Sequence, residues 1–129
     1  MIRMTWAGAF AAVAAALLSP PVQAQEVEQF TSIEKAVESA TKGKKDILVD
    51  FTGSDWCGWC IKLHEEVFSK EEWKKVASGK YVFVELDFPR EKELSEEVKK
   101  YNNEKMEMFG VQGFPTIVVL DSAGKPYAR

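Results

Sequence analysis

VDFTGSDWCGWCIKLHEEVF, residues 49–68, contains both cysteines of the 129-residue chain. The run DILVDF at residues 46–51 is short, apolar and rich in β-branched side chains, which is typical of a buried strand. A Thr-Gly-Ser-Asp turn follows it, and from Cys57 onward the apolar side chains take helical spacing, at Ile61, His64, Val67 and Phe68. The sequence therefore places Cys57 at the start of a helix that follows a buried strand.

Further helices are predicted on either side of this stretch. Thr31 and Glu34 form a capping box ahead of apolar residues at helical spacing, so a helix is expected to residue 42, ending at Gly43. Ser69 and Glu72 form a second capping box, which predicts a short helix ending near residue 79. A charged helix is expected after residue 90, with an inward face formed by Leu94, Val98, Tyr101 and Met108.

Strands are predicted at residues 81–88 and 116–120, and the second is followed by an Asp-Ser-Ala-Gly turn that begins a hairpin. Strands that alternate with helices indicate an α/β fold with a mixed or parallel central sheet flanked by helices. Residues 127–129 begin a strand at which the sequence ends. We therefore expect a closing C-terminal strand or helix to be missing, so that the chain is a fragment or a partner covers one sheet face.

The first 24 residues have the pattern of a signal peptide. Arg3 is followed by an apolar run at residues 4–18 and by Val-Gln-Ala at residues 22–24, which predicts cleavage after Ala24. Residues 25–129 then form one domain that is periplasmic or secreted. Retention of the segment as an anchor is the alternative, and membrane contact is expected only in that case. Export implies an oxidising compartment in which neighbouring cysteines persist as a disulfide.

Charge narrows the range of partners. The net charge is −3, and residues of both signs are scattered along the chain, so neither a nucleic-acid surface nor a basic amphipathic helix is indicated. Proteins or small molecules are the expected partners.

The spacing of the cysteines suggests thiol chemistry. Residues at i and i+3 lie on one side of a helical turn, within the reach of a disulfide. A thiolate at Cys57 would face unpaired backbone N–H groups and the positive end of the helix dipole, which lowers a thiol pKa. Cys60, one turn further on, would be more shielded. An outer nucleophile with an inner resolving thiol is what thiol–disulfide exchange requires.

Two other interpretations of the cysteine pair remain open. Cys57, Cys60 and His64 could bind copper(I) or zinc, because thiolates and imidazole suit these metals. The pair could also be an inert structural disulfide, although so small a loop removes little entropy from the unfolded chain.

Taken together, the strand ILVDF, the WCGWC helix start and GFPT before a later strand resemble the thioredoxin superfamily. The chain is most similar to exported thioredoxin-like thiol–disulfide oxidoreductases with a W-C-x-W-C centre, over about residues 30–129. The resemblance implies a three-layer fold and exchange with protein thiols and disulfides, aided by a redox partner protein and no cofactor. It implies that Cys57 attacks the substrate disulfide and that Cys60 resolves the mixed disulfide. It also implies that the Phe114–Pro115 peptide bond is cis and that these two residues position the substrate. Asp50 resembles the buried carboxylate that takes the proton of the resolving cysteine; an aspartate at the strand end that reaches solvent is the alternative.

The residues around the cysteines suggest how substrate is bound. Gly58 and Trp59 separate the cysteines and supply no cation for the Cys57 thiolate, so we expect a reducing potential near that of thioredoxin. Trp56 and Trp59 could form an aromatic rim for apolar substrate segments, or pack against neighbouring loops. His64 is expected to be a partly buried residue at the edge of the core.

Overall fold

The structure is a computed structural model that describes residues 26–129, and its centre is a five-stranded sheet with the order β1-β3-β2-β4-β5. β1, β3 and β2 run parallel to one another, whereas β4 is antiparallel to β2 and β5 is antiparallel to β4. The predicted mixed sheet is therefore present. The strands are β1 (Gln29–Phe30), β2 (Asp46–Thr52), β3 (Tyr81–Asp87), β4 (Thr116–Leu120) and β5 (Pro126–Ala128).

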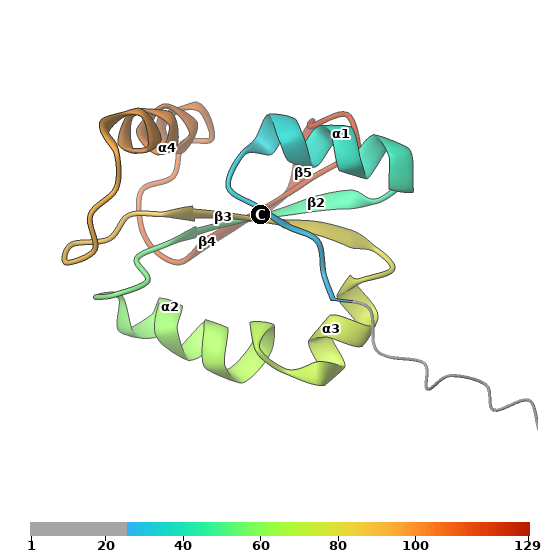
Figure 1. Cartoon of the computed structure of the whole chain (residues 1–129), viewed down its shortest axis with the longest axis horizontal. Helices are drawn as coiled ribbons and strands as arrows, with labels where there is room; N and C mark the ends of the chain where they lie inside the picture. Colours follow the sequence, from blue (N-terminus) through green and yellow to red (C-terminus); the bar gives the residue numbers. More distant parts are fainter. Residues whose placement is uncertain (1–25) are drawn as a thin grey trace, which may run out of the picture.

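Helices cover both faces of the sheet and give a three-layer α/β structure (Figure 1). One face carries α1 (Ile33–Gly43) and α4 (Glu96–Met108). The other carries α2 (Gly58–Leu63), the π-helix η1 (His64–Phe68) and α3 (Glu71–Ala77). Each face of the sheet therefore carries helices. A hollow of about 430 Å³ does lie beside β5, and it is lined by Met108, Phe109, Val118, Pro126, Tyr127, Ala128 and Arg129.

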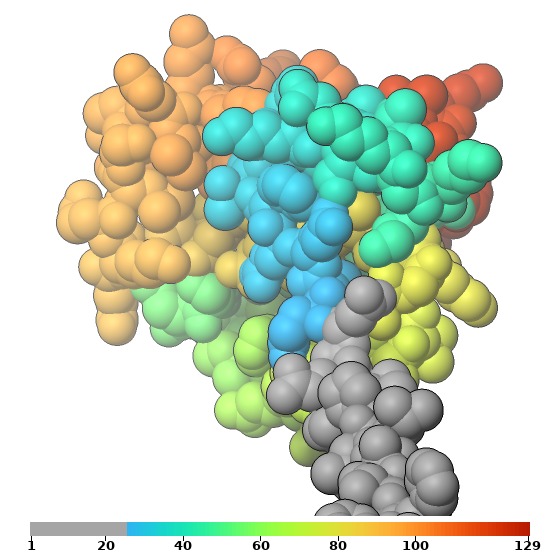
Figure 2. Space-filling model, turned by 45° about the vertical axis from the view of Figure 1, so that its right-hand side comes forward, coloured from blue at the N-terminus to red at the C-terminus, as the bar shows by residue number. Residues whose placement is uncertain are grey.

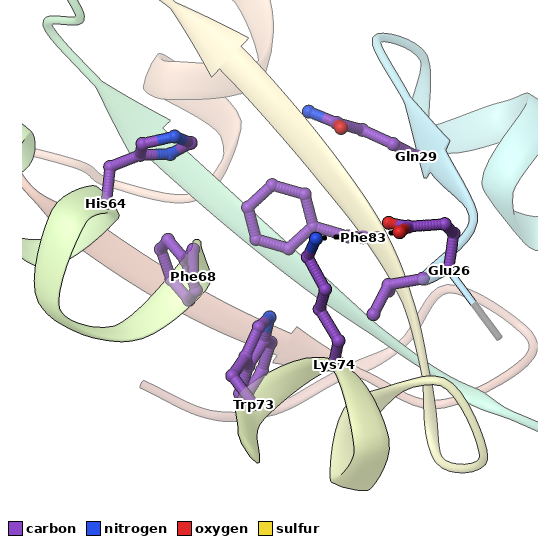
Figure 3. A pocket seen from close by; sticks show the side chains of 8 residues that line it. Glu26, Gln29, His64, Phe68, Trp73, Lys74 and Phe83 are labelled. Carbon is purple, nitrogen blue, oxygen red and sulfur yellow. Dashed lines mark hydrogen bonds and ion pairs between the residues drawn. The ribbon is translucent and has the colours of Figure 1, made fainter. Parts of the chain in front are cut away.

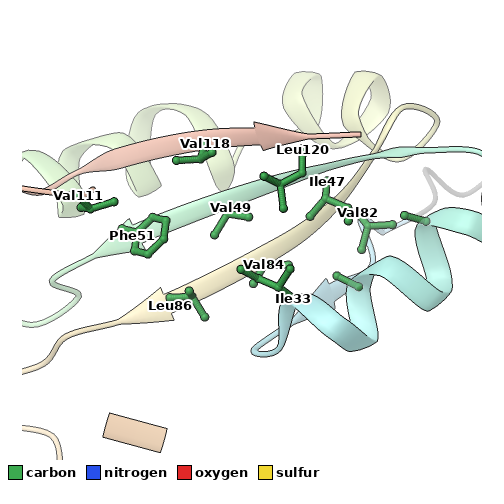
Figure 4. Packing of buried hydrophobic residues seen from close by; sticks show 12 residues of the cluster. Ile33, Ile47, Val49, Phe51, Val82, Val84, Leu86, Val111, Val118 and Leu120 are labelled. Carbon is green, nitrogen blue, oxygen red and sulfur yellow. The ribbon is translucent and has the colours of Figure 1, made fainter. Parts of the chain in front are cut away.

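The main core lies between the sheet and the α1 and α4 layer. Alternate residues of β2 and β3 point into it, because successive side chains of a strand face opposite sides of a sheet. Figure 4 shows this cluster, whose members from β2, β3 and β4 are Ile47, Val49, Phe51, Val82, Val84, Leu86, Val118 and Leu120. The intervening residues of β2 face α2, and they include the buried Asp50.

The caps of the helices differ in detail from the sequence predictions. Ser32, not Thr31, is the N-cap of α1, and its hydroxyl accepts a hydrogen bond from the Lys35 N–H. Helix α1 ends at Gly43, and its C-cap is Lys44, which adopts the left-handed conformation with φ 52°. Ser69 caps nothing in α3: Lys70 is the N-cap there, and the Ser69 hydroxyl donates to the Glu65 carbonyl. Two adjacent hydroxyl residues made the α1 cap ambiguous in sequence.

The inward face of α4 was only partly predicted. Tyr101 contacts the core as expected, but Val98 and Met108 are exposed. Asn102 is buried instead, and its amide donates to the carbonyl of Asp87 at the end of β3. A polar side chain at the contact conceals the inward face from a search for apolar periodicity.

The segment from residue 26 into β1 lies at the edge of the sheet. In the space-filling view its atoms, in blue, lie between α1 and the helices of the opposite layer (Figure 2). The predicted signal peptide, residues 1–24, lies outside the described residues. No helix within residues 26–129 is both long and apolar enough to cross a membrane.

Candidate active site

Cys57 and Cys60 form a disulfide at the start of α2. Their Cα atoms are 5.2 Å apart, within the usual range for such a bond. Cys57 has an extended backbone and is the N-cap of the helix, where its Sγ accepts a hydrogen bond from the Cys60 N–H at 3.2 Å. The sequence prediction that Cys57 stands at the helix start is confirmed.

Both cysteines are largely buried in this disulfide form. Cys57 is 7% exposed and Cys60 is 4% exposed, so the expected order is present but the difference is small. The Sγ of Cys60 accepts from the Gly53 N–H at 3.5 Å, and the Cys57 N–H donates to the Gly53 carbonyl at 2.9 Å. The turn at Gly53 therefore contacts both members of the pair.

Trp56 is fixed in place beside Cys57. Its indole N–H donates to the Phe88 carbonyl at 2.7 Å, and the Arg90 guanidinium lies 3.8 Å from the centre of an indole ring. The ring packs directly over Gly53, where a Cβ would lie 2.5 Å from it, so only glycine fits there. Trp56 also packs against Phe114 in a T-shaped arrangement, with 5.9 Å between ring centres.

Trp59 has the opposite character. It is 72% exposed, and together with Pro115 it lines an open, mostly apolar groove of about 540 Å³. The Lys62 ammonium lies 5.4 Å from its ring centre. Gly58 beside it is exposed, and a Cβ there would meet nothing within 4 Å. The two tryptophans that the sequence grouped together thus have different environments.

Phe114 and Pro115 are joined by a cis peptide bond, as the resemblance implied. They precede β4, which pairs with the end of β2. Phe114 contacts Trp56 and Phe88, and Pro115 shares the groove with Trp59. The segment before β4 therefore lies next to the helix start that carries the disulfide.

Asp50 is 5% exposed, so it does not reach solvent in the way that the alternative interpretation required. Burial in the first place, and then the negative charges of Glu85 and Asp87, raise its pKa to about 7. Its Oδ1 has no hydrogen-bond partner within residues 26–129. Asp50 and Cys60 both line a cavity of about 270 Å³ between the sheet and α2.

Several residues around this cavity were not recognised in the sequence. Glu85 lines it from β3, and Thr52, Ser54, Ile61 and Glu65 line it together with His64, which the sequence analysis had singled out. Asp87 accepts from the Ser54 N–H at 3.0 Å and from its hydroxyl. The alternation of VFVELD indicates which face of β3 Glu85 occupies, but its position beside Asp50 depends on the register of β2 and β3, which no local pattern specifies.

The loop that holds Trp56 has a second anchor that was also missed. The Asp55 carboxylate accepts three backbone N–H bonds, from Arg90, Glu91 and Lys92, each at 2.9 Å. These hydrogen bonds lower the pKa of Asp55. They tie the loop before the cysteines to the loop after β3, from which Arg90 reaches Trp56.

His64 begins η1 and is exposed, which differs from the partly buried position expected. Within the described part of the chain, no three or more His, Cys, Asp or Glu side chains are grouped so that they could hold a metal ion. Cys57, Cys60 and His64, the set considered for copper or zinc, are therefore not placed so that they could hold one metal ion together.

The sheet order, the disulfide at the helix start and the neighbouring cis proline together define a family. The model of the thioredoxin-like domain matches residues 33–129, and the chain belongs to this family.

Among characterised relatives, the chain is similar to the disulfide bond reductase DsbH of Chlamydia pneumoniae, with 39% identity over 101 residues. That match covers 78% of this chain and 61% of the relative. The thioredoxin-related protein DsbJ of the same organism is 28% identical over 107 residues, which cover 78% of this chain and 31% of DsbJ. The chain thus spans about three fifths and about one third of the lengths of these two relatives.

Solved structures show the same fold. A DsbH oxidoreductase structure matches with a TM-score of 0.76 and 35% identity, covering 86% of this chain and 76% of that one. A disulphide isomerase from Xylella fastidiosa Temecula1 matches with a TM-score of 0.59 and 22% identity, covering 85% and 78% of the two chains. The second likeness concerns the fold alone.

Proposed function

We propose that this protein is a thiol–disulfide oxidoreductase that exchanges disulfides with protein substrates through Cys57 and Cys60. The observation that carries the proposal is the disulfide at the N-cap of α2, next to the cis Phe114–Pro115 segment. The Cys57 Sγ also accepts a hydrogen bond from the Cys60 N–H. The similarity to a protein named as a disulfide bond reductase supports the same chemistry.

The reaction begins with both cysteines reduced. The Cys57 thiolate, stabilised by the helix N-terminus, attacks one sulfur of a substrate disulfide, and the other substrate sulfur leaves as a thiolate. The Cys60 thiol then loses its proton and attacks the Sγ of Cys57. This second step releases the remaining substrate sulfur and forms the Cys57–Cys60 disulfide. Two electrons pass to the substrate, and a dithiol protein acting as redox partner restores the reduced pair.

Asp50 is the proposed acceptor of the Cys60 proton. It shares the cavity with Cys60, and a pKa raised to about 7 suits a group that takes up and returns a proton near neutral pH. A cavity of about 270 Å³ has room for several waters at about 30 Å³ each, so the transfer need not be direct.

Substrate is proposed to bind across the open groove. Trp59 offers an exposed apolar face, and Pro115 lines the same groove. The backbone of Phe114, before Pro115, is the proposed contact for an extended substrate segment. Gly58 leaves open space next to the disulfide. Trp56 contributes less by contact than by holding Phe114 and the loop around Gly53 in place.

We further propose that residues 1–24 are a signal peptide and that residues 25–129 act as one thioredoxin-like domain outside the cytoplasm. The apolar run at residues 4–18 and the Val-Gln-Ala cleavage pattern support this assignment. An oxidising compartment would supply both disulfide substrates and a need for a dedicated redox partner.

The test is reduction of insulin with dithiothreitol as the terminal reductant. The unmodified protein is expected to accelerate insulin precipitation, and Cys57→Ser should abolish the effect. Cys60→Ser should attack substrate but stall, giving a mixed disulfide that is visible on a non-reducing gel. The two variants are matched controls for each other, since each removes one sulfur. Insulin reduction that persists in Cys57→Ser would contradict the proposal.

A further inference from the structure

Asp50 and Glu85 form a pair of neighbouring acidic residues inside the fold. They are directly paired in the parallel register of β2 and β3, so both side chains point to the same face of the sheet. Both line the cavity that also contains Cys60. Asp50 is buried, and Glu85 is half-buried beside it.

Two carboxylates this close in a poorly solvated site resist simultaneous ionisation, so the pair tends to keep one proton. The pKa values of both are raised, with burial as the first cause in each case; the charges of Glu85 and Asp87 add to it for Asp50, and that of Asp87 for Glu85. The unpartnered Oδ1 of Asp50 leaves an acceptor atom free within the described residues.

The other charged groups near the pair come from three elements. Asp87 lies on β3 and is held by Ser54 and by Lys92, whose ammonium is 3.6 Å from its carboxylate. His64 and Glu65 line the cavity from η1. The charges of His64 and Lys92 act to lower the pKa of Glu85, which offsets part of the rise. On the remaining side β4 presents Ile117, which is uncharged.

His64 connects this cavity with the surface. It lines the cavity on one side, and it also lines a second, smaller pocket of about 80 Å³. Figure 3 shows that second pocket: His64 and Phe68 project from η1, and Lys74 reaches across it to Glu26. Because His64 is itself exposed, its imidazole is accessible to buffer while it remains at the cavity wall.

We propose that Asp50 and Glu85 share one proton and that His64 exchanges it with solvent, so that the three residues relay the proton released by Cys60. The inference rests on the proposed exchange function. When the Cys60 thiol is deprotonated to attack Cys57, its proton passes through the cavity to the carboxylate pair, and from there through His64 to bulk water. The direction reverses when a partner dithiol reduces the disulfide and Cys60 regains a proton. Glu85 and His64 act through Asp50.

The test separates the resolving step from substrate recognition. The reduced full chain is mixed with an aromatic disulfide reagent that releases one coloured thiolate on attack by Cys57 and a second on resolution by Cys60. In the unmodified protein the rate of the second phase is expected to rise with pH around an inflection near 7, set by Asp50. Glu85→Gln removes a negative neighbour, so the inflection should move down by roughly one pH unit.

Three further variants test the negative charge at position 85 and the role of His64 as the exit for the proton. Glu85→Asp keeps the charge and should restore the inflection of the unmodified protein, whereas Glu97→Gln, the same change on the distant α4, should leave it in place. His64→Ala should slow the second phase roughly tenfold at low buffer, and added imidazole should restore it. A role of His64 in packing alone predicts no response to imidazole.

The outcomes distinguish the relay from the exchange function. If the inflection is unchanged in Glu85→Gln, Asp50 and Glu85 do not share a proton. If imidazole does not accelerate the second phase in His64→Ala, His64 does not exchange the proton with solvent. If the unmodified protein shows no second phase at all, or Cys60→Ser retains it, the exchange function itself fails. Should Glu85→Gln not fold, as judged by thermal unfolding, Glu85→Ala removes the same charge and takes its place in the test of the shared proton, and the His64→Ala arm is unaffected.

Discussion

The guanidinium of Arg90 lies over the indole of Trp56, 3.8 Å from a ring centre, on the side of the molecule where the disulfide begins α2. A cation at this distance from an indole face is stabilising, and the ring N–H is also satisfied by the Phe88 carbonyl. Trp56 is therefore held by a cation, a hydrogen bond and the edge contact with Phe114. It is a fixed wall of the site.

We expect Trp56→Ala to lower the free energy of unfolding by about 2 kcal/mol, because it removes a half-buried ring and its hydrogen bond. Trp56→Phe keeps a ring but loses the bond to Phe88, so its cost should be smaller. Urea unfolding measures both, and insulin reduction should fall in parallel as Phe114 loses its contact. An alanine variant as stable and active as the unmodified protein would contradict this account.

Asp50→Asn is expected to stabilise the protein at alkaline pH. The folded-state pKa is about 7 against an ordinary value of 3.8, so the folded protein holds a proton that the unfolded chain releases. Stability is therefore lost as pH rises from about 4 through 7, by an upper bound of about 4 kcal/mol at 1.36 kcal/mol per pH unit. Urea unfolding should give Asp50→Asn a higher free energy of unfolding than the unmodified protein at pH 8, and nearly the same value at pH 4. The same variant should resolve mixed disulfides more slowly.

The reduction potential of the Cys57–Cys60 couple should lie near that of thioredoxin, about −270 mV, because Gly58 and Trp59 bring no cation to the Cys57 thiolate. Trp59→His places a cationic or hydrogen-bonding ring there, which stabilises the thiolate and hence the reduced form. We expect the potential to rise by about 30 mV or more. Equilibration with glutathione measures both values. A lower potential in the histidine variant would refute the argument.

Trp59→Ala should weaken the binding of protein substrates without impairing thiol chemistry. The ring is 72% exposed and lines the groove with Pro115, so its loss removes contact area that only a polypeptide can use. We expect a higher KM for insulin and an unchanged rate with a small aromatic disulfide. Val76→Ala removes another exposed apolar side chain, on α3, and should change neither value.

The sequence was sufficient for those parts of the fold that depend on local pattern. The apolar run of β2, the helix start at Cys57 and the strand after Pro115 all lie where spacing and turn residues indicated. The pairing of Asp50 with Glu85 was not visible in the sequence, because it depends on the register of two strands whose paired residues lie 35 positions apart along the chain. The different environments of Trp56 and Trp59 also escaped prediction, since the Asp55 and Arg90 contacts join distant loops. Local composition does not specify such contacts.

The change from α2 to η1 has a consequence for the evolution of this chain. A π turn, closed here by the Ser69 N–H donating to the His64 carbonyl at 2.8 Å, accommodates one residue more than an α turn. Deleting Glu66 would let this turn close with ordinary α-helical hydrogen bonds, and the residues after it would keep their direction relative to α2, because the turn and the chain lose one residue together. Phe68 would then keep its ring contacts with Phe83 and Trp73. The length of the chain can therefore change by one residue at this turn without a compensating change in the aromatic cluster.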